Sequence, residues 1–214
     1  MGVAVIADIV GSRGLPDREA AQRAIEHAVA RVQGDLADAT RPLTPTVGDE
    51  LQGIYPDLGS AMCGILLLRL ALPDEVDCRF GVGVGDIGTI ASDTVGAIAE
   101  GPGWWAAREA IDTTHRMQRR TVPGARTWVS ASADTGEQTR EAVRIANAGL
   151  LARDQLVSAM SARARRLAYG RCLGTTQRAL AVAEGITQSA VSQLLGTSGA
   201  SAIVEGFRAL RSGS

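Results

Sequence analysis

The stretch VIADIVGSR, residues 5–13, decides how the first half of this chain is interpreted. Its apolar residues favour a buried strand, yet this strand contains Asp8 and is followed by the turn GSR. A carboxylate at the end of a central strand, followed by a glycine turn, lies beside backbone N–H groups. Such a carboxylate can bind Mg²⁺, and such N–H groups can bind phosphate. Taken alone, Asp8 could instead cap a helix or pair with Arg13 or Arg79.

Outward from this strand, the apolar pattern alternates between the two periods of strands and helices. We expect strands at residues 3–10, 44–47, 51–55, 78–89 and 126–131, and helices at 17–38, 58–71 and from GPGWW (101–105) through Met117. A loop is expected between the strand at 78–89 and the third helix. The two short central strands have hairpin spacing. This order predicts an α+β domain with a ferredoxin-like, antiparallel sheet, over residues 1–136.

The glycines of CRFGVGVGDIGT, residues 78–89, alternate with larger apolar residues. Glycine inside a strand indicates that something large lies close to the backbone. From about Glu137 the pattern becomes helical to the end of the chain, with no further strand signal. We therefore place a second, all-α domain at residues 137–214.

The helical domain contains TQRALAVAEGITQSAVSQLL, residues 176–195, which has the pattern of a helix-turn-helix. Leu180 and Ala181 would pack the first helix, Gly185 would form the turn, and Val191 and Leu194 would hold the second helix. The short and amide side chains left exposed are of the kind that reads a major groove. The residues expected to contact double-stranded DNA are Gln177, Arg178, Thr187, Gln188, Ser189, Ser192 and Gln193. A plain helical hairpin is the alternative.

The composition excludes several classes of protein. All 22 basic residues are Arg, so Schiff-base chemistry and a P-loop lysine are excluded. The three cysteines are dispersed and predict neither disulfides nor a zinc site. Without a signal-peptide pattern or a long apolar run, we expect a cytoplasmic protein with no membrane partner.

The charge is unevenly distributed along the chain. Residues 1–150 carry 14 Arg against 20 acidic residues, a net charge of −6, whereas residues 151–214 carry 8 Arg against 3 acidic residues, a net charge of +5. A basic tail on an acidic body indicates that a polyanion binds at the tail.

A second carboxylate for a metal site should come from a strand next to the first. The stretch TVGDELQG, residues 46–53, supplies Asp49 at the tip of the hairpin, and Gly48 permits the tight turn. Glu50 would be a solvated turn residue or a partner for an arginine.

These motifs together carry a resemblance to known families. ADIVGS and TVGDE resemble the two metal-binding motifs of class III nucleotidyl cyclases, and RFGVGVGDI and GPGWWAAR resemble the segments that follow them. The full set of motifs, ending in a helix-turn-helix, resembles the bacterial SatD family more closely. That resemblance covers nearly the whole chain.

The resemblance implies a role for individual residues. Asp8 and Asp49, with the carbonyl of Ile9, would bind Mg²⁺ or Mn²⁺. The segment from Ile9 to Arg13, which includes Val10, Gly11 and Ser12, would hold the phosphates of a nucleoside triphosphate together with Gly48. Arg108 would match the cyclase arginine that stabilises the transferring charge, unless it only pairs with Glu109 or Asp112.

Two departures weigh against catalysis. Trp104 stands where cyclases have a ribose-orienting asparagine, and Pro45 stands where they have a purine-selecting lysine. We therefore expect a homodimeric transcription regulator that binds DNA and senses a nucleotide, rather than an enzyme. The alternatives are an active nucleotidyl cyclase or phosphotransferase whose tail serves dimerisation, and a scaffold without a ligand. Trp104 and Trp105 are candidates for a dimer contact or for simple packing.

Overall fold

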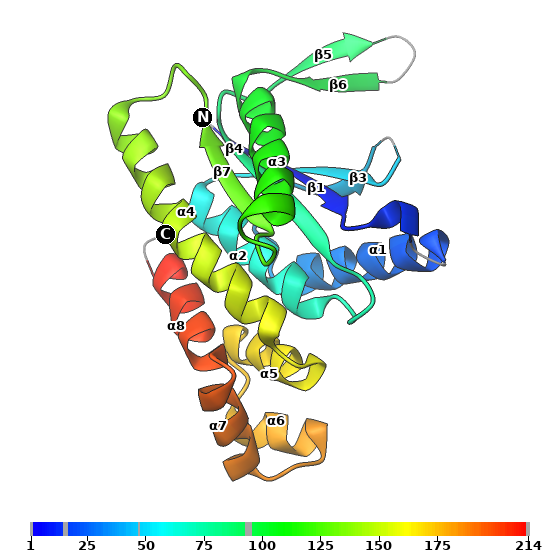
Figure 1. Cartoon of the computed structure of the whole chain (residues 1–214), viewed down its shortest axis with the longest axis vertical. Coiled ribbons are helices and arrows are strands. Elements are labelled where there is room, and N and C mark those ends of the chain that lie inside the picture. The colour runs from blue at the N-terminus through cyan, green and yellow to red at the C-terminus, as the bar shows by residue number, and fades with distance from the viewer. Residues whose placement is uncertain (1, 15–16, 47, 93–95, 213–214) are drawn as a thin grey trace.

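In the computed structural model, a five-stranded sheet forms the centre of the first half of the molecule (Figure 1). The structure describes residues 2–14, 17–46, 48–92 and 96–212, with the backbone alone at residues 13, 89–92 and 96–99. The strand order is β2-β3-β1-β4-β7. These strands are β1 (Gly2–Ile9), β2 (Arg41–Pro45), β3 (Glu50–Tyr55), β4 (Cys78–Gly85) and β7 (Thr127–Ala131). The strand that contains Asp8 is therefore the middle strand of the sheet.

Side chains of β1 alternate between two helical layers, as the period of a strand requires. Val5 and Ala7 belong to the core that includes α1 (Arg18–Asp35) and α2 (Leu58–Ala71). Ala4 and Ile6 belong to a smaller core with α3 (Pro102–Arg120). In Figure 1, α3 lies on the opposite side of the sheet from α1 and α2. The bounds of α2 are those that the sequence predicts, and α1 ends at Asp35 rather than at residue 38.

Two features of the strands differ from the sequence-based expectation. First, β7 pairs with β4 in parallel, so the sheet is mixed rather than wholly antiparallel. Parallel neighbours need a long crossover connection, which α3 supplies here. Second, β5 (Gly88–Ser92) and β6 (Gly96–Glu100) form a separate antiparallel pair where a loop was expected. Most residues of this pair are Gly, Ala and Ser, which have little preference for strands.

The glycines of β4 allow α3 to approach the sheet closely. A Cβ atom added to Gly81 would lie 2.3 Å from the carbonyl oxygen of Ala107, and one added to Gly83 would lie 2.0 Å from that of Gly103. Both distances are far shorter than a van der Waals contact. The large body that the glycine-rich strand predicts is thus the backbone of α3.

The outer edge of β7 is covered by α4 (Glu137–Ala159). The buried amide of Asn147 donates from Nδ2 to the carbonyl oxygen of Val129, and its Oδ1 accepts from the N–H of Val129, both at 2.8 Å. This side chain therefore pairs with β7 as a further strand would. An uncovered edge would expose unpaired backbone groups, so α4 completes the sheet.

The chain continues from α4 into α5 (Ala162–Cys172), α6 (Gln177–Glu184), α7 (Gln188–Thr197) and α8 (Ala200–Arg211). Helices α5 and α8 pack against α2, and one hydrophobic core extends from the sheet into these helices. Figure 1 shows α6 and α7 at the opposite end of the molecule from β5 and β6. Among the helices that the structure describes, none is long and apolar enough to cross a membrane.

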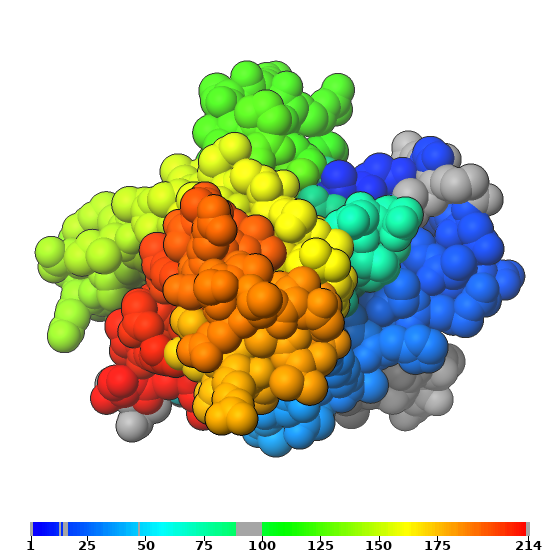
Figure 2. Space-filling view, turned by 90° about the horizontal axis from the view of Figure 1, so that it is seen from below, coloured from blue at the N-terminus to red at the C-terminus, as the bar shows by residue number. Residues whose placement is uncertain are grey.

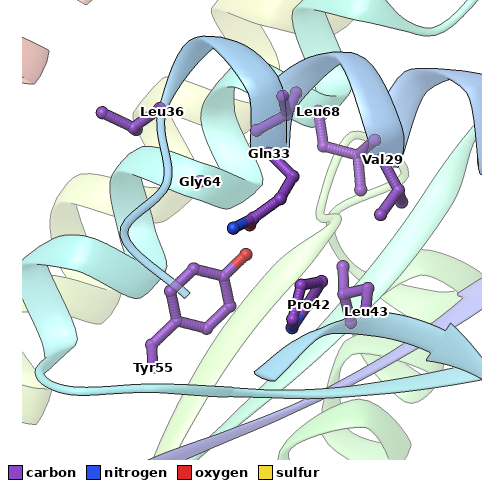
Figure 3. A pocket seen from close by; sticks show the side chains of 9 residues that line it. Val29, Gln33, Leu36, Pro42, Leu43, Tyr55, Gly64 and Leu68 are labelled. Carbon is purple, nitrogen blue, oxygen red and sulfur yellow. The ribbon is translucent and has the colours of Figure 1, made fainter. Parts of the chain in front are cut away.

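A small cavity between α1, α2, β2 and β3 belongs to the packing of this core (Figure 3). Its volume is about 10 Å³, close to the minimum that one water molecule needs. Tyr55 and Gln33 point into it among apolar neighbours. Burial raises the pKa of Tyr55 to about 12. A nucleotide has no room in this cavity.

Candidate functional site

Paired charges gather where β3, β1 and β4 run side by side. Glu50 and Arg79 flank Asp8 in the register of the sheet. The two oxygens of Asp8 accept hydrogen bonds from Nε and Nη2 of Arg79, at 2.8 and 2.9 Å. Arg79 Nη1 also donates to Gln118 of α3, at 3.1 Å. Asp8 is therefore the partner of Arg79, one of the alternatives that the sequence leaves open.

A second bidentate pair joins α3 to the sheet. Arg108 donates from Nη1 and Nη2 to the two oxygens of Glu50, at 2.6 and 2.8 Å. Burial raises the pKa of Glu50, but hydrogen bonds from Arg108 and Gln52 outweigh that effect and hold the pKa below its usual value. Arg108 thus pairs with Glu50, and neither Glu109 nor Asp112 is its hydrogen-bond partner. The sequence offers no local signal for this pair, because 58 residues separate its members.

Two charges besides that of Arg79 also affect the pKa of Asp8. Burial raises the pKa of the Asp8 carboxyl above its usual value, and the Arg79 guanidinium opposes that rise. The negative charge of Asp49 adds to the rise, whereas His115 of α3 opposes it. The structure therefore places Asp49 and His115 in the electrostatic neighbourhood of Asp8. Nothing in the sequence marks His115 for this position.

Next to the paired charges, a hollow of about 290 Å³ opens between the turn after β1 and the β2–β3 hairpin. Its walls include four residues that the sequence predicts for the site and three that it does not: Ile9, Ser12, Gly48 and Asp49, with Arg18, Glu19 and Gln22 of α1. Gly11 and Gly48 have φ angles of 69° and 74°, in the left-handed region that glycine adopts without strain. The two glycine turns thus shape this hollow.

The sequence motifs do not predict Arg18 as a site residue, although it lies close to the predicted turn. It is the first residue of α1, directly after Asp17, whose carboxylate accepts from the N–H of Ala20 at 2.8 Å. A guanidinium at the start of a helix favours an anionic ligand, because the guanidinium and the N-terminus of the helix both carry positive potential. Glu19 in the same wall has the opposite effect. The wall of the hollow therefore contains both a positive and a negative side chain.

One of the predicted phosphate ligands, Val10, has its backbone donor engaged within the protein. The N–H of Val10 donates to the carbonyl oxygen of Asp77 at 2.9 Å, so this donor is already used within the protein. Gly11 accepts from the N–H of Gly14 at 2.8 Å, which closes the turn. The side chain of Arg13 lies outside the described residues.

The side chains, as placed, do not fit a two-metal centre. Within the described ranges, no three His, Cys, Asp or Glu side chains come close enough together to hold a metal ion. Asp8 uses both oxygens on Arg79, whereas a pair of metal ions requires carboxylates that converge on the ions. Ile9 and Asp49, the other expected ligands, line the neighbouring hollow. Metal binding at Asp8 would require Arg79 to move.

Trp104 and Pro45, the two departures from the cyclase pattern, do not line this hollow. Trp104 is only 5% exposed and packs with Ala4 and Ile6. The guanidinium of Arg41 lies 5.3 Å from the centroid of the Trp104 ring. Pro45 is exposed at the end of β2. Trp104 therefore serves the packing of α3, which leaves Trp105 as the exposed member of the tryptophan pair.

At the far end of the molecule, α6 and α7 are joined through Gly185, whose φ of 64° is the left-handed turn expected for it. Leu180 and Ala181 are buried on α6, as predicted. On α7 the predicted packing residue Val191 is buried, and Leu194, the other, is half-buried and packs against the core; Leu195 is buried as well. The geometry of two short helices around a glycine turn is thus present.

The predicted DNA-contacting residues of α7 share an exposed surface. Figure 2, which views the molecule from below, shows α6 and α7, in orange, facing the viewer. Thr187 caps α7 by accepting from the N–H of Ala190, and its hydroxyl lies 2.9 Å from that of Ser189. The exposed side chains are Thr187, Gln188, Ser189, Ser192 and Gln193, with Arg178 on α6, whereas Gln177 is half-buried.

Much of the positive charge of the tail is used within the protein. Arg163 and Arg166 of α5 both pair with Glu184 at the end of α6, at 3.4 and 2.7 Å. Two other arginines of the tail reach acidic residues of the sheet half: Arg165 pairs with Asp74, and Arg211 with Asp38. The uneven charge of the sequence therefore reflects, in part, attraction between the two halves.

No curated protein matches this chain. Among solved structures, a bacterial light-regulated adenylyl cyclase is 14% identical, with a TM-score of 0.43 over 54% of this chain and 40% of that one. A guanylyl cyclase domain from the aquatic fungus Blastocladiella emersonii is 15% identical, with a TM-score of 0.41 over 52% and 73%. An adenylyl cyclase from P. aeruginosa is 13% identical, with a TM-score of 0.39 over 56% and 81%.

The family comparison covers far more of the chain than any of these structures does. The model of the SatD family matches residues 2–204, which include the sheet, the charge cluster, the hollow beside Asp49 and both α6 and α7. This chain belongs to the SatD family.

Proposed function

We propose that this chain is a DNA-binding regulator in which α6 and α7 form a helix-turn-helix unit and the hollow beside Asp49 binds a nucleotide. The observation that carries the proposal is the exposed surface of α7. It presents Gln188, Ser192 and Gln193 to solvent while Val191 and Leu195 hold the helix from behind. Amide and hydroxyl side chains on the first turns of a protruding helix can reach base edges in a major groove.

Replacing both Gln188 and Ser192 with alanine is expected to remove sequence preference and leave the fold intact, because both side chains are exposed. Each lost base contact costs about 1–3 kcal/mol of discrimination. Selection from a random duplex library, followed by fluorescence anisotropy, measures the preference. Gln138→Ala, at an exposed position of α4, is the matched control. Absence of salt-dependent binding of the wild type to any duplex would contradict the proposal.

Arg178→Ala should act differently, since Arg178 is the exposed arginine of α6. A phosphate contact carries no sequence information, so its loss should weaken binding to all duplexes about equally. The slope of log K against log salt should become shallower by about 1. Anisotropy titrations at several salt concentrations separate this effect from the loss of preference.

The nucleotide part of the proposal rests on the hollow of about 290 Å³ and on Arg18 in its wall. A ligand at a hundred times its dissociation constant stabilises the folded protein by roughly 2.7 kcal/mol. We expect ATP or GTP to raise the melting temperature of the wild type and to have a much smaller effect on Arg18→Ala. Arg140→Ala, on the exposed side of α4, should behave as the wild type does. If no nucleotide stabilises the wild type, the domain is a scaffold without a ligand.

Binding without turnover is part of this proposal. Asp8 and Arg108, which catalysis would need, are each held in a bidentate ion pair. Incubation with ATP or GTP and Mn²⁺, followed by chromatography, should yield no cyclic nucleotide. Clear accumulation of a cyclic product that Asp8→Ala abolishes would favour a nucleotidyl cyclase instead.

A further inference from the structure

The outer side of α3 carries one exposed tryptophan and several exposed charged residues. Trp105 is 62% exposed near the start of the helix. Glu109 and Asp112 follow on the same face, and Arg116 and Arg120 lie towards its end, all of them exposed. The spacing of these residues matches one face of a helix, opposite the face that packs on β4. In Figure 1, α3 stands on the outside of the molecule, with the sheet behind it.

Each end of this face borders a hollow, and the two hollows differ in chemistry. Near the start of α3, a hollow of about 360 Å³ has a mostly apolar lining that includes Trp105, Glu109 and Asp134. Towards the end of α3, a hollow of about 390 Å³ is lined by His115, Arg116, Arg119 and Arg120. One hollow is therefore aromatic and acidic, and the other is strongly basic.

The basic end is not neutralised within the protein. In the described part of the chain, Arg116, Arg119 and Arg120 form no ion pair; Arg116 donates only to the hydroxyl of Thr113, at 2.8 Å. Most other arginines of the chain meet a carboxylate, as Arg79, Arg108 and Arg126 do. Glu109 and Asp112 likewise have no ion pair among the described residues. Unpaired acidic residues thus lie near the middle of α3, and unpaired arginines lie towards its end.

We propose that this face binds a second copy of the same chain, with the two α3 helices antiparallel across a two-fold axis. Centring the axis between Asp112 and Thr113 brings Glu109 next to the partner subunit's Arg116. The same register brings Trp105 next to the partner subunit's Arg120. A two-fold axis forms every contact twice, so the Glu109–Arg116 and Trp105–Arg120 contacts each occur twice, while the exposed Asp112 and its copy lie beside each other at the axis.

The residue types suit the centre of an interface. Tryptophan and arginine are enriched in protein–protein contacts, and a guanidinium over an indole ring adds cation–π attraction. The apolar surface beside Trp105 would receive the aliphatic stem of an arginine from the partner, while Glu109 and Asp134 would face its charge. This interface is formed by α3 and the residues around the end of β7, and it requires neither DNA nor a nucleotide.

Sedimentation equilibrium of the full chain, without DNA or nucleotide, tests the proposal. We expect the wild type to be dimeric. Glu109→Arg should raise the dimer dissociation constant about tenfold or more, because two attractive contacts become repulsive. Arg116→Glu should have the same effect. The double variant Glu109→Arg with Arg116→Glu should return to within about threefold of the wild type, since the charges are exchanged but remain complementary.

The control is Glu141→Arg, an identical charge change at an exposed position of α4, which should leave the dimer unchanged. All the substituted side chains are exposed, so circular dichroism melts should match that of the wild type. A wild type that stays monomeric at roughly 100 μM would overturn the proposal, because interfaces with micromolar dissociation constants would form at that concentration. A double variant as dissociated as Glu109→Arg would also overturn it. So would a dimer that only Glu141→Arg disrupts, which would place the interface on α4.

Discussion

Replacing Asp154 with alanine is expected to lower the free energy of unfolding by about 3–5 kcal/mol, the cost of leaving a buried charge without its partner. Asp154 is fully buried on α4. It accepts from Arg69 Nη1 at 2.8 Å, and from the backbone N–H groups of Arg126 and Thr127 at 2.8 and 2.6 Å. One carboxylate thus joins α2, α4 and the start of β7.

The size of this effect follows from the position of Arg69, which is only 4% exposed. Burial lowers the pKa of the Arg69 guanidinium, and the negative charge of Asp154 opposes that change. Without Asp154, the guanidinium of Arg69, that of Arg153, which donates to the same carboxylate at 3.0 Å, and two backbone N–H groups would all lose a partner. Heat and urea denaturation should show the loss, with a decrease in melting temperature of roughly 6–20 °C for a chain of this size.

A double-mutant cycle separates the charge from the packing. Arg69→Met removes the buried cation and keeps most of the volume of the side chain. The variant with both Asp154→Ala and Arg69→Met should therefore be more stable than Asp154→Ala alone. Strictly additive losses in the two single variants would mean that the ion pair does not account for the effect. Glu141→Gln, at an exposed position of the same helix, should change stability by no more than about 0.5 kcal/mol.

Replacing Gly83 with alanine is expected to lower the free energy of unfolding by about 3 kcal/mol or more, since overpacking of this kind forces the backbone to shift. The added Cβ would lie 2.0 Å from the carbonyl oxygen of Gly103 and 2.3 Å from the nitrogen of Ala107. Both are backbone atoms of α3, so no side-chain rotation can relieve the contact. Helix α3 would have to move away from β4 and would take Trp104 and Arg108 with it.

The control for this substitution is Gly149→Ala on α4. A Cβ added to Gly149 meets nothing within 4 Å, and its φ is not positive. Alanine in a helix interior is better than glycine by about 0.5–1 kcal/mol, so this variant should be slightly more stable than the wild type. Chemical denaturation of both variants gives the comparison directly. A Gly83→Ala protein as stable as the wild type would mean that α3 is not closely packed on β4.

The net charge of the C-terminal part of the chain is easily misinterpreted from the sequence alone. The net charge of +5 after residue 150 indicated a surface for a polyanion. Arg165 and Arg211 instead pair with acidic residues of the sheet half, and Arg163 and Arg166 pair with Glu184. A net charge counts residues without regard to their partners. It therefore predicts long-range attraction between segments as well as affinity for a ligand.

Much of the fold could be predicted from the sequence alone. The strand around Asp8, the hairpin with Asp49 at its tip, the bounds of α2 and the helix pair around Gly185 all follow from local pattern. Each depends on apolar period, on capping residues and on glycine conformation, which act within a few residues along the chain. Local pattern predicted both glycine turns, but Ile9, Ser12, Gly48 and Asp49 line one hollow because β1 and β3 pair antiparallel and place the two turns at neighbouring strand ends.

The ion pairs were decided only by the tertiary structure. Asp8 and Arg79 are 71 residues apart, Glu50 and Arg108 are 58 apart, and Arg69 and Asp154 are 85 apart. The parallel pairing of β7 with β4 likewise depends on the path of α3 across the sheet. The periodicity of apolar residues indicates which face of a helix or strand is buried, but it does not indicate which element packs against that face. The sequence therefore shows that a carboxylate on a buried strand needs a partner. Whether that partner is a metal ion or an arginine depends on which distant strands and helices pack beside it.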